Sequence, residues 1–323
     1  MVSIIIPNWN RKDLLVRCLD SIEKQSYKGI EVIVVDNGSS DGSQDAIIEK
    51  YPKVKLIANH ENDLFCRAQN QAIKIAQGKY IISLNNDVVL KEDFIDEMVK
   101  TVELDSRIGM ASGKVMRMDA KTLDSTGLFL DRSRRPIERG YDKIDVGQYE
   151  SPGYIFGVGG AVAFFRREML EDIRINGEYF DEDYGMFYED LDLCWRAQRK
   201  GWKAYYSPSA LAYHIRGATA RRHIPNLRVL KGFLFAWLDE RLQFLLVRNR
   251  YATIIKNDTL KDFLRNLLYI LLYELKLWSY LLLFRPKVIL RLVKEIGWLK
   301  RAFKKRLLFI PLDSKHLTGF TCQ

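Results

Sequence analysis

Hydrophobic and polar positions alternate in two distinct ways along the first hundred residues of the chain. Short runs rich in Val and Ile and bounded by turn residues predict strands. These runs are Val2–Pro7, Glu31–Asp36, Val54–Ala58 and Tyr80–Leu84. Amphipathic stretches between them predict helices. These stretches are approximately Asp13–Gln25, Gly42–Tyr51 and Arg67–Ala76, with Asp41 placed to cap the second. The alternation predicts a Rossmann-like half with a parallel sheet.

The following residues, up to about residue 220, carry a less regular, mixed pattern. Two helices are expected here, one near Glu92–Glu103 and one beginning near Glu189. The strands expected here are Ile108–Met116, Ile155–Phe165 and Lys203–Ser207. We therefore expect a domain over residues 1–220, with halves of about 1–105 and 106–220.

From about Arg221 the sequence becomes helical, Leu-rich and basic, which predicts a separate tail over residues 221–323. Leu264–Phe284 is apolar enough to suggest a membrane span, but charged and amide residues interrupt it and argue against a full crossing. Over Arg291–Leu307, apolar residues share one helical face and basic residues the other. That pattern is typical of a helix in a lipid interface. A helix packed on the first domain is the alternative.

Charge strengthens this division of the chain. The net charge is +10, and residues 221–323 hold 21 Lys and Arg against 7 Asp and Glu, so the excess lies in the tail. Such a tail favours an anionic partner, either a membrane surface or a nucleic acid.

The cysteines and the N-terminal residues indicate a cellular compartment. Cys18, Cys66, Cys194 and Cys322 have no paired spacing, which argues against a disulfide framework or a zinc knuckle and favours a reducing compartment. The chain opens with a strand-like run and lacks the pattern of a signal peptide. A cytoplasmic location is therefore expected.

Polar residues follow three of the predicted strands, at Asn8–Asn10, Asp36–Asp41 and Asn85–Asp87. Functional groups of such sheets collect where the strands end, so these residues are expected to face one crevice. A carboxylate such as Asp36 can accept a hydrogen bond from a base or ribose, and Asp87 can hold Mg²⁺ or Mn²⁺ bridged to a diphosphate. An ordinary polar turn is the alternative for each.

A further acidic cluster lies at the predicted helix start Glu189-Asp190-Leu191-Asp192, where the helix dipole favours anions. Glu189 or Asp190 is a candidate general base, and a capping role is the alternative for at least one. His214 is either a metal ligand or a buried, hydrogen-bonded histidine. The glycine-rich run Phe156–Ala161 lacks the spacing and position of a dinucleotide loop, so no such cofactor is expected.

Taken in order, these motifs resemble the family 2 glycosyltransferases of the GT-A fold, from Ser3-Ile4-Ile5-Ile6-Pro7-Asn8-Trp9-Asn10 through His214. They look most like bacterial transferases that build O-antigen or other cell-surface polysaccharides, such as rhamnosyltransferases. Over roughly the first two-thirds of the chain, the resemblance implies a GT-A, Rossmann-like α/β fold, a mixed sheet with helices on both faces. The pattern of the tail adds the expectation of a C-terminal helical membrane-associating extension.

The resemblance also implies a set of donor-binding residues, which hold the nucleoside, the diphosphate and the sugar. They are Pro7, Asn8, Asn10, Asp36, Asn37, Gly38, Arg67, Asn70, Asn85, Asn86, Asp87, Gly159 and Gly160. One position departs from the family, because Leu64 stands where the family has Gly.

Roles in catalysis follow from the same resemblance. Asn85-Asn86-Asp87 stands where the family has its Asp-x-Asp motif, so Asp87 becomes the principal ligand of Mg²⁺ or Mn²⁺ and His214 a further one. Asp190 corresponds to the catalytic base, and Glu189 would orient hydroxyl groups.

The implied function is an inverting transfer from a nucleoside-diphosphate sugar, dTDP-rhamnose or a UDP-hexose, to a glycan acceptor carried on a polyprenyl lipid. The enzyme would lie peripherally on the inner face of the cell membrane, with homodimerisation through the tail left open. A sugar nucleotidyltransferase and a non-enzymatic nucleic-acid-binding protein are the alternatives. The first usually has a basic Gly-rich phosphate loop, absent between Ile6 and Leu14, and the second leaves the acidic motifs unexplained, so no nucleic-acid partner is expected.

Overall fold

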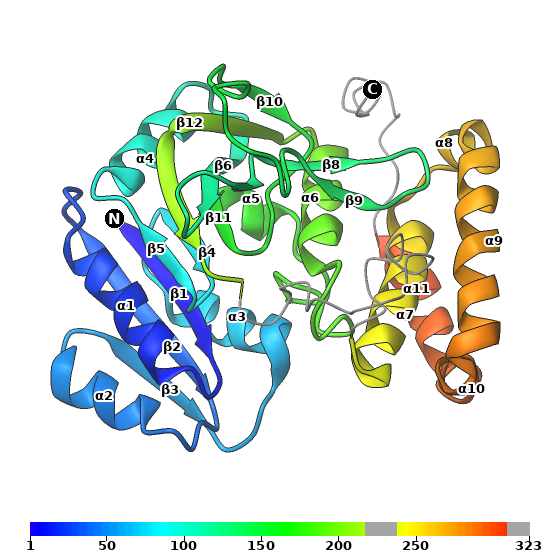
Figure 1. The fold of residues 1–323 in the computed structure, drawn as a ribbon, viewed down its shortest axis with the longest axis horizontal. Helices are drawn as coiled ribbons and strands as arrows, with labels where there is room; N and C mark the ends of the chain where they lie inside the picture. Colours follow the sequence, from blue (N-terminus) through cyan, green and yellow to red (C-terminus); the bar gives the residue numbers. More distant parts are fainter. Residues whose placement is uncertain (217–237, 309–323) are drawn as a thin grey trace. The chain divides into compact units, whose positions relative to one another are not determined.

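A computed structural model describes residues 1–216 and 238–308 of the chain (Figure 1). Met1–Asp131 and Pro136–Ile215 belong to one compact unit. Arg132–Arg135 belong instead to a second unit, together with Arg216 and the described residues 238–308. The domain boundary expected at residue 220 lies outside the described residues.

The first unit contains a ten-stranded mixed sheet with the order β10-β12-β6-β11-β4-β1-β2-β3, in which β5 pairs with β12 and β7 with β6. Strands β1 to β4 run parallel, whereas β11 is antiparallel to both of its neighbours. The strands of this sheet are β1 (Val2–Asn8), β2 (Ile30–Asn37), β3 (Lys55–Asn59), β4 (Tyr80–Leu84), β5 (Val88–Leu90), β6 (Ile108–Arg117), β7 (Leu123–Ser125), β10 (Gly153–Ile155), β11 (Val162–Arg166) and β12 (Lys203–His214). A separate hairpin consists of β8 (Leu128–Leu130) and β9 (Pro136–Glu138).

Helices cover both faces of the sheet, as Figure 1 shows for this unit. The helices are α1 (Lys12–Glu23), α2 (Ser43–Lys50), α3 (Leu64–Ile75), α4 (Phe94–Glu103), α5 (Arg167–Asp172) and α6 (Glu189–Arg199). Val2, Ile4 and Ile6 of β1 share one buried cluster with α1, α2 and α4. Ile5 points to the opposite face, because side chains alternate along a strand, and α3 packs on β1 and β2. Burial on both faces explains the continuous apolar runs of the central strands.

The expected single strand Ile155–Phe165 is wrong, because a loop over residues 156–161 separates the end of β10 from the start of β11. β10 ends at Ile155 and β11 begins at Val162, on different parts of the sheet. The glycine-rich loop between them pairs with the hairpin: Leu128 and Gly157 exchange two backbone hydrogen bonds of 2.9 and 3.1 Å. Glycine lowers strand propensity, which permits this departure from the sheet.

Strand β12 extends well past its expected end at Ser207. Its register with β6 shifts between Ser207 and Leu211, after which the strand continues to His214. The final residues also pair with β5, and His214 lies opposite Val88. This pairing places the end of β12 beside the turn that precedes β5.

The second unit contains the described part of the tail. Its helices are α7 (Glu240–Asn257), α8 (Leu260–Arg265), α9 (Leu267–Phe284), α10 (Pro286–Lys294) and α11 (Gly297–Leu308). The expected continuous helix Arg291–Leu307 is wrong, because α10 ends at Lys294 and α11 begins at Gly297, a residue of poor helix propensity. Leu292 is buried, while Ile296 and Phe303 are exposed.

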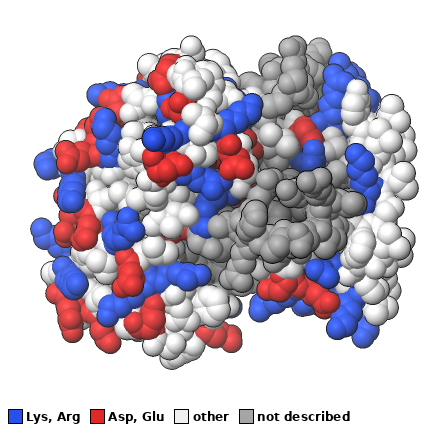
Figure 2. All heavy atoms as spheres, in the orientation of Figure 1, with Lys and Arg blue, Asp and Glu red and all other residues white. Residues whose placement is uncertain are grey.

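Helix α9 presents a large apolar surface. Figure 2 shows uncharged side chains over α9 with Lys and Arg beside them. By length and composition, α9 meets the criterion for a membrane span. The exposed apolar residues of α9 are Leu268, Tyr269, Leu271, Leu272, Leu275, Leu282, Leu283 and Phe284.

The cysteines in the described part of the chain are unpaired. Cys18, Cys66 and Cys194 are free and buried, and Cys322 lies outside the described residues. Burial raises the pKa of each described thiol, so these cysteines remain protonated and act as small apolar core residues.

Candidate active site

The loops after β1 and β2 are joined by a buried polar network. Asp36 is fully buried, and its two oxygens accept hydrogen bonds from Asn8 Nδ2 (2.9 Å), the Ser39 N–H (2.9 Å) and Gln44 Nε2 (2.7 Å). Asn10 donates its backbone N–H to Ser39 Oγ at 2.8 Å. Asp36 therefore fixes the shape of these loops, while its contact with a nucleoside stays a prediction.

Asn37 and Gly38 connect the same region to the loop that precedes α3. Asn37 accepts a hydrogen bond from Asn59 Nδ2 at 2.9 Å, and its amide lies 3.4 Å from Asn62 Oδ1. Gly38 has φ +74°, and a Cβ built there would lie 2.8 Å from the carbonyl oxygen of His60. Only glycine fits this position, because a side chain meets both backbone strain and backbone atoms.

Leu64 adopts the backbone conformation for which glycine is best suited. Its φ is +64°, in the left-handed region. Asn62 Oδ1 accepts the Leu64 N–H at 3.0 Å and holds this turn. The loop before α3 thus keeps the geometry of a glycine turn although the sequence has leucine, at a cost of roughly 1–2 kcal/mol.

Arg67 and Asn70 lie on α3 in different surroundings. The exposed Arg67 pairs with Asp63 at 2.9 Å on the preceding turn. Asn70 is fully buried and donates to the Phe180 carbonyl (2.7 Å) and to Glu182 Oε1 (3.0 Å), while its Oδ1 accepts the Phe180 N–H at 2.9 Å. Asn70 therefore holds the segment that leads to α6, and donor contacts by either residue stay predictions.

The turn between β4 and β5 connects several parts of the site. Asn86 donates to Asn8 Oδ1 at 2.7 Å, which ties the turn to the loop after β1. Asn85 donates its N–H to the Ala161 carbonyl at 2.9 Å, which ties the turn to the glycine-rich loop. Asp87, largely buried at the end of the turn, is therefore held between both loops.

His214 lies between two carboxylates. Its Nε2 is 3.1 Å from Asp87 Oδ1, and its Nδ1 is 2.8 Å from Asp124 Oδ2 of β7. Burial alone would lower the pKa of His214, but the hydrogen bonds to Asp124 and Asp87 outweigh it and raise this pKa to about 9. His214 is thus a buried, hydrogen-bonded histidine that lies beside Asp87, and its role as a metal ligand stays a prediction.

The side chains of Asp87 and His214 fit a divalent cation that takes most of its ligands from substrate and water. In the described residues, no group of three or more His, Cys, Asp and Glu side chains is arranged to hold a metal. Asp87 and His214 provide a carboxylate oxygen and an imidazole nitrogen 3.1 Å apart. Asp124 orients the imidazole from behind, the arrangement by which carboxylates commonly support metal-binding histidines. Mg²⁺ usually takes one or two carboxylates plus phosphates.

The acidic pair lies at the start of α6. Each oxygen of Asp190 accepts a backbone hydrogen bond, Oδ2 from Gly160 (3.1 Å) and Oδ1 from Leu191 (2.7 Å). Glu189 is buried, and its Oε2 has no hydrogen-bond partner in the described structure. Burial raises the pKa of both carboxyl groups, and the charge of Asp190 raises that of Glu189 further. A negative charge therefore resides more readily on Asp190.

The two glycines of the site, Gly159 and Gly160, differ in the space that a side chain would have. A Cβ at Gly159 would lie 2.5 Å from Glu138 Oε1 of β9, so the protein itself fills this space. A Cβ at Gly160 would lie no closer than 3.6 Å to Asp190 Oδ2, which is ordinary contact. Gly160 contributes its N–H to Asp190, and substrate approach at either glycine stays a prediction.

The remaining residues of the α6 motif are structural. Arg196 is buried, pairs with Asp192 at 2.9 Å and donates to the Ile173 and Tyr179 carbonyls. Trp195 is buried as well. Arg196 is therefore a core residue, because three internal acceptors surround its guanidinium group.

Sequence reasoning missed two carboxylates that support the site. Asp124 holds His214, and Glu138 lies against Gly159 and accepts a hydrogen bond from Ser125. Each is an isolated acid in a short strand, so no local spacing distinguishes it from a surface residue. Only the pairing of distant strands reveals these roles.

A cavity of about 650 Å³ lies elsewhere in the first unit. It is lined by residues of α1 and by residues at the amino ends of β2 and β3. In sheets of this class, ligands bind outside the carboxyl ends of the strands. This cavity is therefore not part of the candidate site.

Comparison with known proteins gives a consistent set of relatives. The profile described as "Glycosyl transferase family 2" matches residues 3–174, more than half of the 323 residues. The amylovoran biosynthesis glycosyltransferase AmsB of Erwinia amylovora is 29% identical over 262 residues, covering 77% of this chain and 80% of that protein. Glycosyltransferase GlyG of Streptococcus pneumoniae is 32% identical over 106 residues, 32% of this chain and 35% of that protein.

Solved structures agree on the fold. The mannosyltransferase PcManGT from Pyrobaculum calidifontis, in complex with GDP-Man and Mn²⁺, has a TM-score of 0.54 at 20% identity, covering 96% of this chain and 76% of that chain. GalNAc-T7 with UDP, GalNAc and Mn²⁺ has a TM-score of 0.59 at 14% identity, and the match covers 79% of this chain and 48% of that chain. At these identities the likeness shows the fold, which is GT-A.

The buried Glu189 makes a measurable prediction about stability. Its pKa lies well above the ordinary 4.5 in the folded chain, so the unfolded chain binds fewer protons near neutral pH. The free energy of unfolding therefore falls as pH rises above 4.5, until the folded pKa is passed. Glu189→Gln should unfold at a higher temperature than the wild type at about pH 7.5 and at the same temperature near pH 4. Thermal unfolding followed by circular dichroism measures this.

Glu49→Gln on α2 is the matched control, because Glu49 is exposed. It should unfold like the wild type at both pH values. A wild-type unfolding temperature for Glu189→Gln at neutral pH would contradict the buried placement of this carboxyl group, in which one oxygen has no hydrogen-bond partner.

Proposed function

Because the chain belongs to glycosyl transferase family 2, we propose that it transfers a sugar from a nucleoside diphosphate to an acceptor hydroxyl with inversion at the anomeric carbon. The family resemblance read from the sequence motifs and the GT-A fold are both confirmed. The observation that carries the proposed mechanism is the turn Asn85–Asp87, which hydrogen-bonds both to the nucleotide-side loop and to the glycine-rich loop beside Asp190.

Asp190 is the proposed general base. The acceptor hydroxyl gives its proton to Asp190, its oxygen bonds to the anomeric carbon, and the bond from that carbon to the diphosphate oxygen breaks. The raised pKa of Asp190 makes its carboxylate a stronger base than an exposed one, while the Gly160 and Leu191 N–H groups keep it ionised in preference to Glu189. Glu189, protonated, would orient hydroxyl groups.

Asp190→Asn tests the base directly. The variant preserves the shape of the side chain and should bind donor like the wild type, yet kcat should fall by about 10²–10⁴-fold because the proton acceptor is gone. Steady-state kinetics measure kcat, and calorimetric titration measures donor binding. Full turnover in this variant would remove Asp190 from the mechanism.

The residues proposed to contact the donor lie at the strand ends. Which sugar and which nucleotide they bind is a question for a binding screen. Candidates are dTDP-rhamnose and UDP-hexoses. A thermal-shift screen with these nucleotide sugars identifies the donor, because a ligand that binds only the native state raises its unfolding temperature.

Asp87 and His214 are the proposed ligands of Mg²⁺ or Mn²⁺, with Asp124 orienting His214. A bound cation supplies charge neutralisation for the departing diphosphate. The related structures of PcManGT and GalNAc-T7 contain Mn²⁺, which supports a divalent metal in this fold.

Asp87→Ala should abolish the metal dependence of nucleotide binding. Calorimetric titration with UDP and with dTDP, each with and without Mn²⁺, measures the effect. The wild type should bind more tightly with metal, and the variant should show one affinity in both conditions. Asp119→Ala, which removes an exposed carboxylate from the turn after β6, should behave like the wild type. Metal-independent binding by the wild type would refute the metal site.

We place the reaction in the synthesis of a cell-surface polysaccharide, with a polyprenyl-linked glycan as the acceptor. Similarity to the amylovoran biosynthesis enzyme AmsB over most of both chains supports the first part. The exposed leucines of α9 and the basic residues beside them support a peripheral position on the inner face of the membrane, where such an acceptor resides (Figure 2). Glu274 on α9 is bound to Arg250 of α7, which favours a helix packed along one side within its own unit over one that crosses the bilayer.

Flotation with liposomes tests this position. The wild type should float with vesicles of phosphatidylglycerol and phosphatidylethanolamine, and high salt should weaken binding. Leu271 and Leu275 are 55% and 68% exposed on one face of α9, so the double variant Leu271→Glu/Leu275→Glu should remain unbound. Ile48→Glu on α2 alters a side chain that is 65% exposed outside the tail and should float normally. Equal flotation of both variants would exclude α9 as the contact.

A further inference from the structure

Asn70 of α3 is bound by the irregular segment 179–185, which leads toward α6. Its Nδ2 donates to the Phe180 carbonyl (2.7 Å) and to Glu182 Oε1 (3.0 Å). Its Oδ1 accepts the backbone N–H groups of Tyr179 (3.1 Å) and Phe180 (2.9 Å). An asparagine amide has two N–H donors and two acceptor sites, so these four bonds use all of them. The fully buried Asn70 can contact a nucleotide sugar only by giving up one of these bonds.

The first turn of α3 contacts the same segment at Gly185. Cys66 donates its backbone N–H, one of those that a helix start leaves without an internal partner, to the Gly185 carbonyl at 3.0 Å. A Cβ built on Gly185 would lie 2.7 Å from Leu64 Cδ1, so the leucine fills the space that this glycine leaves. The residue at which the chain departs from its family therefore has a packing partner here. We call Leu64, Cys66 and Asn70 the α3 anchor.

Helix α6 binds the segment as well. Arg196 donates to the Tyr179 carbonyl at 2.9 Å, and the Tyr184 hydroxyl donates to Asp192 Oδ1 at 3.2 Å. Both bonds are buried, and all of these residues belong to the first unit (Figure 1). The backbone of Tyr179 is thus bound by α3 through its N–H and by α6 through its carbonyl. The segment therefore connects these two helices.

The chain enters α6 through two residues in a strained backbone conformation. Phe187 and Tyr188 both have φ +68°, in the left-handed region that bulky residues rarely adopt. Such a conformation persists only where the surrounding structure fixes it, and it is common at functional sites. Glu189 and Asp190 follow directly at the start of α6. The direction of the acidic pair therefore depends on how firmly the preceding segment is held.

We propose that Asn70 and Leu64 are positioning residues for the transfer reaction: the α3 anchor fixes the segment 179–185, and the segment fixes the start of α6 with the carboxyl group of Asp190. Leucine at position 64 accepts the cost of a left-handed backbone and gains the contact with Gly185. The kinetic part of this proposal rests on the proposed function of Asp190, whereas the structural part does not.

Two variants weaken the anchor in different ways. Asn70→Asp preserves the size of the side chain and its acceptor sites, but it removes both N–H donors and places a carboxyl group against Glu182. Leu64→Gly removes the packing on Gly185 and keeps the left-handed turn, which glycine adopts without strain. Because its backbone strain is relieved, Leu64→Gly should stay folded even if the buried substitution at Asn70 does not.

Hydrogen–deuterium exchange of the full chain provides a test that needs no substrate. In both anchor variants, amides of residues 184–192 should exchange roughly tenfold faster than in the wild type, because the segment opens more often. None of these amides bonds to the α3 anchor, so their exchange reports on the segment and not on a lost direct contact. Ile47→Val, which removes one methyl group from a buried position of α2, is the control for lost stability and should leave this exchange unchanged.

Kinetics provide the second measurement, with the nucleotide sugar identified by thermal shift as donor. Both anchor variants should lose roughly 10–100-fold in kcat with an unchanged donor KM, because a small displacement of a catalytic group costs turnover. Ile47→Val should keep the wild-type kcat. The double variant Asn70→Asp/Glu182→Gln should recover part of the kcat that Asn70→Asp loses, because a glutamine amide can donate to the new carboxylate.

The outcomes separate the hypotheses. Faster exchange of residues 184–192 with a lower kcat supports the proposal. Unchanged exchange in both anchor variants overturns it, whatever their activity, and so does equally fast exchange in Ile47→Val. Faster exchange with a wild-type kcat refutes the role in positioning, and a raised donor KM with an unchanged kcat assigns Asn70 to the donor site instead. An active Asp190→Asn variant refutes the proposed base alone, and the exchange measurement still decides whether the α3 anchor fixes the segment.

Discussion

The candidate site depends on the hydrogen bonds made by one short turn between β4 and β5. Asn86 reaches the loop after β1, Asn85 reaches the glycine-rich loop, and Asp87 meets the last residue of β12. The turn is short because β5 leaves the parallel part of the sheet and pairs with β12 instead. A polar turn at this position joins the loop after β1, the glycine-rich loop and His214, which are far apart in sequence.

Burial and hydrogen bonding give the carboxyl groups of the site different tendencies to carry a charge. Asp190 receives two backbone N–H donors and can hold a charge, whereas Glu189 beside it has a partnerless oxygen and favours a proton. Asp36 is saturated by hydrogen bonds and serves the loop. Carboxyl groups thus serve as the proposed base, as the proposed neutral donor or as a structural acceptor, depending on the hydrogen bonds that their surroundings supply.

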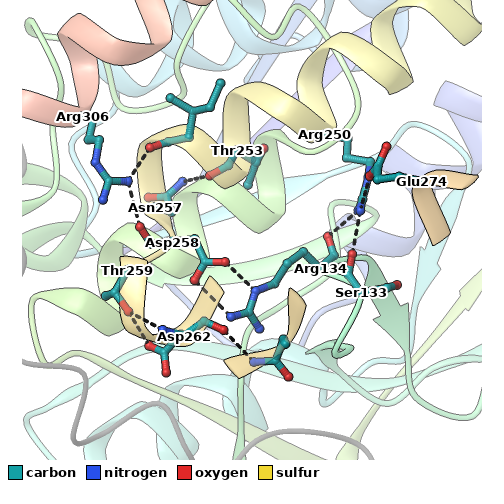
Figure 3. Close-up of polar contacts among 12 residues, drawn as sticks. Ser133, Arg134, Arg250, Thr253, Asn257, Asp258, Thr259, Asp262, Glu274 and Arg306 are labelled. Carbon is teal, nitrogen blue, oxygen red and sulfur yellow. Dashed lines mark hydrogen bonds and ion pairs between the residues drawn. The ribbon is translucent and has the colours of Figure 1, made fainter. Parts of the chain in front are cut away.

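Two buried ion pairs act in a similar way in different parts of the chain. Arg196 with Asp192 holds the segment before α6 through the carbonyls that Arg196 also binds, and Arg134 with Asp258 joins the segment Arg132–Arg135 to the end of α7 within the second unit (Figure 3). In both cases an arginine joins a carboxylate to an irregular segment of the chain. Directional contacts of this kind specify one arrangement of a loop, which apolar packing alone does poorly.

The sequence by itself determined the strands of the nucleotide half, the start of α6 at Glu189 and the family, because these depend on local periodicity and on motifs in order. It could not decide that Ile155–Phe165 divides into two strands or that Arg291–Leu307 breaks at Gly297. Only the tertiary structure showed the partners of Asp124, which lies 90 residues from His214. A side chain's role at such a separation is set by which strands pair, and strand pairing is a property of the whole sheet.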